Sequence, residues 1–177
     1  MMPRAGDEIV NPRTGQRMIF RQTASETAGD LLQIECFSPS STAREPEHIH
    51  PYQENRFELL SGTLRFRVQG REQTLGPGEV ITIPPGTPHC FWNDSDEEAR
   101  YIQEFRPAME IGAFFERLFG LARDGKLTDK GAPGIMQMAV SGPAFWNEIR
   151  VSQPPEIVQK IVFALLEPIG RLLGYRP

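Results

Sequence analysis

Short segments in which apolar and polar residues alternate run through the first part of this chain, with Gly, Pro, Asn and Asp residues between them. Alternation with a period of two is typical of strands that bury one face. Regularly spaced short strands of this kind favour a β-sandwich or a barrel. The segments lie at residues 16–23, 30–37, 55–62, 63–70, 71–75, 79–84, 89–93 and 99–105. We therefore expect an all-β architecture up to about residue 106.

After Arg106-Pro107 the apolar residues recur with a helical period. A first apolar helical face ends at Asp124-Gly125, a short helix is expected at 134–140, and a longer one follows Pro154-Pro155. Pro168 inside that last helix predicts a kink or a break. The first and last faces are formed by Ile111, Phe114, Phe115, Leu118 and Ala122, and by Ile157, Ile161, Leu165, Ile169 and Leu172.

These helices offer too little apolar surface for a separate globule. We therefore expect a β domain at residues 1–106 and a helical extension at 107–177 that packs on this domain or on a dimer partner. The apolar faces of the extension would cover the mouth of the β domain or hold a homodimer together.

Composition narrows the classes of partner. The 177 residues have a net charge of −4 and no basic block, which disfavours a nucleic-acid partner. No apolar run is long enough to span a bilayer, and the first twenty residues lack the apolar run of a secretion signal. The two cysteines, Cys36 and Cys90, form no paired motif. These features predict a cytoplasmic, reduced protein that needs no disulfide for its core.

The three histidines of the chain form the candidate site. His48 and His50 are two residues apart, so a strand aims both imidazoles into one space. His89 follows a Pro-Gly turn within residues 78–93, and a neighbouring antiparallel strand can bring it opposite the first pair. Three neutral imidazoles suit Zn, Fe, Ni, Mn or Cu better than Ca or Mg.

At these residues the sequence resembles the cupin superfamily. The first cupin motif is HxH, three or four residues, Glu, six residues and Gly; the second is G, five residues, PxG, two residues, H, three residues and N. The likeness covers residues 30–106. It implies a double-stranded β-helix, or jelly-roll cupin barrel, with a divalent transition metal (Fe, Mn, Ni or Zn) held by residues of both motifs. The matched positions are His48, His50 and Gly62 in the first motif and Gly78, Pro84, Gly86, His89 and Asn93 in the second.

The fourth ligand departs from the family pattern. Counting back from Gly62 reaches Asn55 where the family usually has Glu, whereas counting forward from His50 reaches Glu54. Alternation favours Asn55 as the inward residue, because Glu54 shares its face with charged neighbours. A β-bulge near Pro51-Tyr52 would turn Glu54 inward instead. An amide would leave the metal more Lewis acidic and hold it less tightly than a carboxylate would.

The same alternation predicts the other side chains that face the cavity. Phe57, Phe91, Tyr101 and Gln103 point inward and are the candidate substrate-binding residues, with Gln103 as a possible support for the metal ligands. Cys36 also points inward, but no spare histidine is left to activate it as a nucleophile.

Two functions remain open. The first is a metal-dependent enzyme acting on an apolar or aromatic small molecule, with dioxygenase-like chemistry implied by the resemblance to cupins such as the quercetin dioxygenases. The second is a non-catalytic cupin that binds or senses a small ligand, motivated by the amide at Asn55 and by the scarcity of acid–base groups. The resemblance also favours a homodimer.

Overall fold

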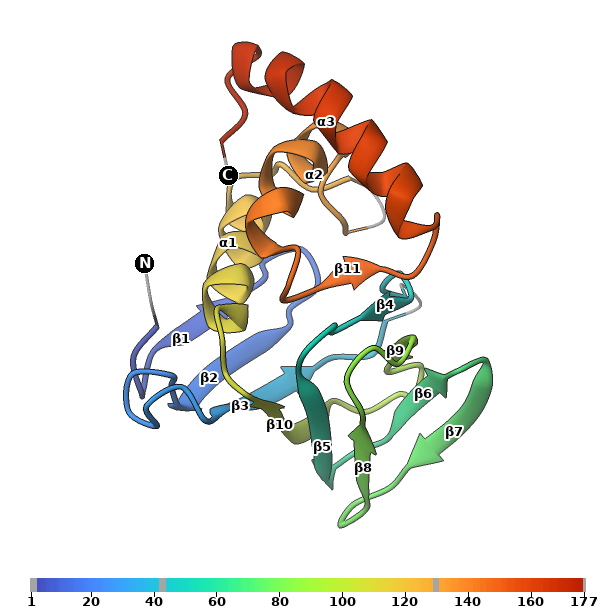
Figure 1. Ribbon diagram of the computed structural model, residues 1–177. Helices are drawn as coiled ribbons and strands as arrows, with labels where there is room; N and C mark the ends of the chain where they lie inside the picture. The colour runs from blue at the N-terminus through green and yellow to red at the C-terminus, as the bar shows by residue number, and fades with distance from the viewer. Residues whose placement is uncertain (1–2, 42–43, 129–130, 177) are drawn as a thin grey trace.

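The computed structural model describes residues 3–41, 44–128 and 131–176. Strands make up the first part of the chain and helices most of the rest, and every strand and helix predicted from the sequence is present (Figure 1). The strands are β1 (Glu8–Val10), β2 (Arg17–Gln22), β3 (Leu32–Ser38), β4 (His48–Ile49), β5 (Glu54–Ser61), β6 (Leu64–Val68), β7 (Arg71–Leu75), β8 (Val80–Ile83), β9 (His89–Trp92), β10 (Ala99–Arg106) and β11 (Arg150–Val151). The helices are α1 (Ile111–Arg123), α2 (Ile135–Ser141), the 3₁₀ turn η1 (Gly142–Phe145) and α3 (Glu156–Leu172).

The strands form two antiparallel sheets. One has the order β1-β2-β3-β10-β5-β8 and the other the order β11-β4-β9-β6-β7. Phe57 of the first sheet contacts Phe66 and Phe91 of the second, with ring centroids 5.0 Å apart in both pairs. The sheets therefore pack face to face, as in a double-stranded β-helix. The term all-β holds only for the strand portion, because three α-helices follow, and the strands form two sheets rather than one closed barrel.

Strand alternation places the expected side chains inside. In β5, Asn55, Phe57 and Leu59 are buried while the residues between them are partly exposed. Glu35 of β3 is an exception to this alternation: it lies between the inward residues Ile34 and Cys36, yet it is only 3% exposed and is paired with Arg21 and Arg100. Burial raises the pKa of the Glu35 carboxyl, but the hydrogen bonds from the two guanidinium groups outweigh this and lower the pKa overall.

Cys90 and Trp92 of β9 are likewise buried although they lie on an outer face. They point away from the His89 side, yet each is only 4% exposed. The guanidinium of Arg44 stacks on the Trp92 ring, 4.1 Å from its centroid, so a cation–π contact covers this outer face.

Gly62 has a structural reason for its place in the first motif. It turns the chain between β5 and β6 at φ +77°, and an added methyl group would lie 2.6 Å from the Glu98 carbonyl oxygen. Both the left-handed backbone and the close approach of a neighbouring chain segment require glycine here.

The helices form a cover over one end of the sheets (Figure 1). Ile111, Phe115 and Phe119 of α1 belong to the same core as the strands, whereas α2 packs against α3. Helix α3 continues through Pro168, so of the predicted kink or break, the break does not occur. The carbonyl that loses its partner belongs to the exposed Ala164, where solvent can hydrogen-bond to it. Within the described ranges, no helix has the length and apolar character that a bilayer span requires.

Candidate metal centre

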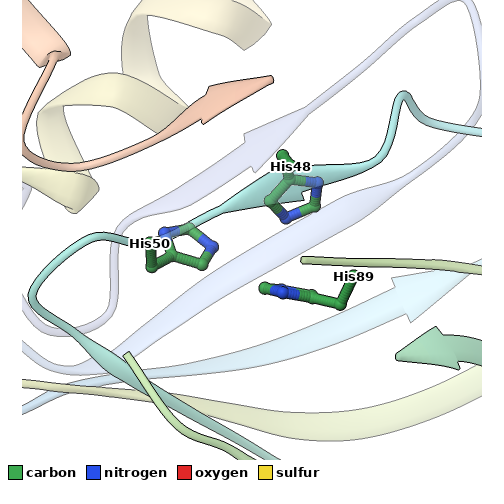
Figure 2. A group of neighbouring side chains, drawn as sticks. All are labelled: His48, His50 and His89. Atoms are coloured by element: carbon green, nitrogen blue, oxygen red, sulfur yellow. The ribbon is translucent and has the colours of Figure 1, made fainter. Parts of the chain in front are cut away.

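The three histidines meet at one end of the second sheet. His48 in β4 is the cross-strand partner of His89, the first residue of β9, and His50 follows β4 directly. Figure 2 shows the three rings turned toward a common space. The ring centroids are 4.4 Å apart for His48 and His89, 5.2 Å for His48 and His50, and 5.4 Å for His50 and His89. The HxH spacing and the antiparallel register together produce this convergence.

Each imidazole is oriented by a hydrogen bond to a backbone carbonyl. The Nδ1 atoms of His48, His50 and His89 lie 3.0, 2.7 and 2.8 Å from the carbonyl oxygens of Pro46, Glu148 and Thr87. A carbonyl oxygen only accepts, so each Nδ1 carries the proton and donates it. The Nε2 lone pairs are thereby left available, which is the arrangement that a metal-binding histidine needs.

Burial keeps the three rings neutral. Desolvation, with a smaller effect of the neighbouring imidazoles, lowers the pKa of His48 well below its ordinary value and lowers that of His50 to about 3. Burial also lowers the pKa of His89. Neutral imidazoles are the form that binds transition metals.

The donor set fits a single metal ion. One ligand atom from each of the three buried histidines lies within 4.8 Å of the others. Two metal–nitrogen bonds of about 2.1 Å span at most about 4.2 Å, so small side-chain shifts bring the nitrogens into range. An all-imidazole set suits the transition metals rather than Ca or Mg.

Asn55 stands beside this cluster in a chain of hydrogen bonds. Its amide nitrogen lies 3.5 Å from Nε2 of His89, and its oxygen accepts a hydrogen bond of 3.2 Å from the Gln103 amide. Gln103 in turn accepts a weak hydrogen bond from the Cys36 thiol, with 3.9 Å between the sulfur and the oxygen. Presenting the Asn55 oxygen to an ion would need a rotation of its amide, and Gln103 would have to rotate with it.

Glu54 lies on the opposite face of β5. It is paired in register with Arg106 and is partly exposed, whereas Asn55 is fully buried. Regular alternation holds from Glu54 to Leu59, so the inward turn of Glu54 considered from the sequence does not occur.

A cavity of about 560 Å³ opens next to the histidines. His48, His50, Phe91 and Gln103 are part of its wall. The helical part of the chain supplies much of the remaining wall, and most of these side chains are aromatic or aliphatic. They include Phe114, Phe115, Leu118, Phe119, Met138, Phe145, Trp146, Ile149 and Phe163.

Two of the predicted substrate-binding residues lie elsewhere. Phe57 and Tyr101 are fully buried, and their ring centroids are 5.9 Å apart within the core formed by the two sheets. Both point inward as expected, but the inward face of a strand includes packed core as well as cavity wall. Tyr101 is held there by a hydrogen bond of 3.2 Å with Ser38.

Sequence reasoning missed a polar part of the wall. Arg44 and Glu45 line the cavity, and the Glu45 carboxylate lies 3.7 Å from Nδ1 of His48. Desolvation by the surrounding wall raises the pKa of Glu45, although 40% of its side chain is exposed, which limits the size of this effect. Both residues belong to an irregular segment, and without a period no orientation can be assigned from the sequence.

Comparison with known proteins agrees with this geometry. A family model described as a cupin domain matches residues 33–103, which hold both motifs. The chain therefore contains a cupin domain at these residues. The match ends before α1, so the cupin model describes the strands and leaves the helical wall of the cavity outside it.

Two curated relatives are similar to this cupin. The probable oxidoreductase patJ of Aspergillus clavatus is 27% identical over 96% of this chain and 57% of its own length. The quercetin 2,3-dioxygenase of Bacillus subtilis is 32% identical over 44% of this chain and 25% of its own length. The chain thus spans little more than half of the first relative and a quarter of the second. The alignment with patJ covers nearly the whole chain and therefore includes the helices.

Among solved structures, KdgF from a Halomonas species is similar at a TM-score of 0.50 and 16% identity. That similarity covers 60% of this chain and 92% of KdgF. At this identity the likeness supports the fold alone.

Proposed function

We propose that this cupin is a metal-dependent oxidoreductase with dioxygenase-like activity on an apolar or aromatic small molecule. The observation that carries the proposal is a cluster of three buried, neutral imidazoles, two of which, His48 and His50, form part of the wall of an aromatic cavity of about 560 Å³. A cavity of this size holds a drug-sized molecule. The relatives named as an oxidoreductase and as a dioxygenase support the same reaction class.

His48, His50 and His89 would hold the ion, with Asn55 beside them as a candidate fourth ligand. A transition metal bound there supplies Lewis acidity and, when it is redox active, a path for electrons between a substrate and dioxygen. The protein's own contribution is to fix the imidazole tautomers through three backbone carbonyls and to keep the amide of Asn55 in place through Gln103.

The cavity wall would select the substrate. Phe91 from the strands and Phe114, Phe145 and Trp146 from the helical part offer ring faces and edges to an aromatic body and exclude water from it. Glu45 offers a carboxyl group next to the histidines, where a polar substituent of the substrate can hydrogen-bond.

A non-catalytic ligand-binding cupin is the second candidate. The observation that favours it is the amide at Asn55, which turns its nitrogen rather than its oxygen toward His89. An amide brings no charge to offset that of a divalent ion and cannot relay protons. Metal binding without turnover would be the expected behaviour of such a module.

The test uses protein purified without a histidine tag. The site contains every histidine of the chain, so histidine-bound metal can only report on this cluster. Samples loaded with Fe, Mn, Ni, Cu or Zn are analysed for bound metal and then for oxygen uptake with a panel of phenols and flavonoids. The proposal expects one ion per chain and substrate-dependent oxygen uptake with at least one metal.

The variant His50→Ala should lose both the ion and the oxygen uptake, whereas Tyr52→Ala, an exposed neighbour, should keep them. Stoichiometric metal with no turnover of any panel member would favour the binding module. Failure of every metal to bind would contradict the metal-dependent oxidoreductase.

Three further expectations stay proposals. They are a cytoplasmic location, a homodimer, and the division into a cupin unit at 1–106 and an extension at 107–177. The sharing of one core by α1 and the strands supports an extension that packs on its own β domain.

A further inference from the structure

Helix α3 is packed through one narrow face only. Gln159 and Gly170 are its buried residues, and a methyl group on Gly170 would lie 2.7 Å from the Val140 side chain of α2. The Gln159 amide donates hydrogen bonds of 3.0 and 2.6 Å to the carbonyl oxygens of Val151 and Pro154. Figure 1 shows α3 at the outer edge of the molecule, with α2 on its inner side.

The opposite face of α3 is an exposed apolar stripe. Its residues recur every three or four positions, so they form one continuous line along the helix. Exposed side chains of this size rarely form such a line on a monomer unless it binds something. The exposed fractions are 65% for Ile157, 55% for Ile161, 66% for Leu165, 47% for Ile169 and 88% for Leu172.

Charged residues lie along only one side of this stripe. On a helical projection, Glu156, Lys160, Glu167 and Arg171 share one flank, and the other flank is apolar. Within the helix they form two pairs, with N–O distances of 2.6 Å for Lys160–Glu156 and 2.8 Å for Arg171–Glu167. Two acidic and two basic groups give the flank no net charge, so it has no electrostatic preference for an anionic membrane surface.

About the middle of α3, each charged residue of the flank is matched by a residue of opposite charge at the same distance on the other side. When two α3 helices lie antiparallel about an axis between Phe163 and Ala164, Lys160 comes opposite Glu167 of the other copy. Glu156 likewise comes opposite Arg171 of the other copy. A twofold axis of this kind also brings the charged flanks of both helices to the same edge of the interface, where the opposite charges can meet. In a parallel pair of helices, the two charged flanks would lie at opposite edges of the interface.

We propose that a second copy of this chain covers the stripe, forming a homodimer through antiparallel α3 helices. The helix has 17 residues and is about 25 Å long. The exposed Leu173 and Tyr175 follow the helix and extend its apolar surface. This inference does not depend on the proposed reaction.

The interface has a consequence for the cavity. Gln159 and Phe163, on the inner face of α3, are part of the cavity wall. A second copy packed on the outer face of α3 would therefore restrict the movement of this helix and of the cavity wall on its inner face. A variant that cannot dimerise should bind an apolar cavity ligand more weakly even though its wall residues are unchanged.

The test measures molar mass by sedimentation equilibrium across a wide range of concentrations, with circular dichroism to check folding. The unchanged protein should have twice the mass of one chain. Leu165→Glu places two carboxylates near the axis and should weaken the dimer by at least about 30-fold. Val80→Glu, a matched change at an apolar residue of β8 that is 47% exposed, should leave the dimer intact.

A charge exchange tests the orientation and covers the case in which Leu165→Glu fails to fold. Lys160→Glu should weaken the dimer because it faces Glu167 of the other copy, and adding Glu167→Lys should restore it. A monomer at every concentration would overturn the proposal and leave the stripe to a different partner. A dimer that survives Leu165→Glu, or a double exchange that restores nothing, would also overturn it.

Discussion

The hydrogen bonds made by Nδ1 of the three histidines explain why this cluster is suited to bind a metal. Three rings packed in apolar surroundings need not bind anything, but here each Nδ1 donates to a backbone carbonyl, which leaves each Nε2 with the lone pair that a metal requires. The carbonyls belong to Pro46, Glu148 and Thr87, and Glu148 comes from the helical part of the chain. The sequence could predict the convergence from the HxH spacing. It could not predict the Glu148 acceptor, because Glu148 is 98 positions from His50.

Asn55 is the residue at which metal affinity should respond most clearly. Asn55→Glu would place a carboxylate beside three imidazoles, and the charge of a ligand set tunes its affinity for cations. We expect affinity for a divalent metal to rise by about tenfold or more. The metal-free variant should be less stable than the natural protein, because Asn55 is fully buried and an unpaired carboxylate would be desolvated there.

Competition with a chelator measures the affinity, and urea unfolding without metal measures the stability. The matched control is Gln33→Glu, a conversion of an amide to a carboxylate in β3 on the face that meets Glu104 rather than the histidines. Equal metal affinity in Asn55→Glu and the natural protein would show that position 55 does not face the ion.

At the level of the elements, strand alternation was the most informative part of the sequence. It gave the inward faces of β3, β5 and β10 because a period of two leaves little choice once one face is buried. It failed for Glu35, which is buried through ion pairs formed across strands. It could not separate Phe57, a core residue, from Phe91, a wall residue, because both lie on inward faces.

The turn between β5 and β6 offers a prediction about the first motif. Gly62→Ala should lower the free energy of unfolding by about 2–4 kcal/mol, because it adds both strain at positive φ and a clash with the Glu98 carbonyl. Gly70→Ala is the matched control: its φ is +78°, but no atom lies within 4 Å of the added methyl group. It should cost only about 1 kcal/mol. Equal losses in urea unfolding would show that the close approach at Gly62 has no energetic weight.

The 3₁₀ turn η1 offers a prediction about the cavity. Phe145 lines the cavity and is only partly buried, so Phe145→Ala should enlarge the cavity with little loss of stability. Once a substrate is known, its KM should rise about tenfold with a smaller change in kcat. Phe37→Ala, which removes a ring lying under Arg17, is the control and should change neither constant. A loss confined to kcat would place Phe145 near the reacting atoms instead.

At the scale of the whole molecule, the cavity lies where the strands and the helical extension meet. The sequence predicted that the extension would cover the β domain or pair with another copy, and the structure shows a covering face and a separate exposed face. Helix α1 and the inner face of α3 contribute to the cavity wall, and the outer face of α3 is exposed. Helical periodicity identifies an apolar face but does not say what covers it, so this division could not be read from the chain.

The neutral histidines predict how the metal-free protein responds to pH. The pKa of His50 is lowered from 6.5 to about 3, so the unfolded chain binds a proton at a higher pH than the folded one. The stability linked to this group is complete above about pH 6.5 and is lost as the pH falls toward about 3, and each unit of pKa difference corresponds to about 1.4 kcal/mol. His48 and His89 act in the same direction.

Urea unfolding of the metal-free protein at a series of pH values measures this effect. The window from pH 7 down to about 5 avoids most carboxyl titration. His50→Gln removes one of the three groups and should flatten the pH dependence in that window. An identical slope in the variant would show that His50 is not a depressed titrating group in the folded protein.

The central claim is that the imidazoles of His48, His50 and His89 share one metal ion. Anomalous diffraction from crystals of protein loaded with Fe or Ni tests it most directly. The account predicts one strong anomalous peak bonded to the three Nε2 atoms at about 2.1 Å, with each Nδ1 still donating to its backbone carbonyl. A peak elsewhere, or binding through Nδ1 with the carbonyl hydrogen bonds broken, would contradict it.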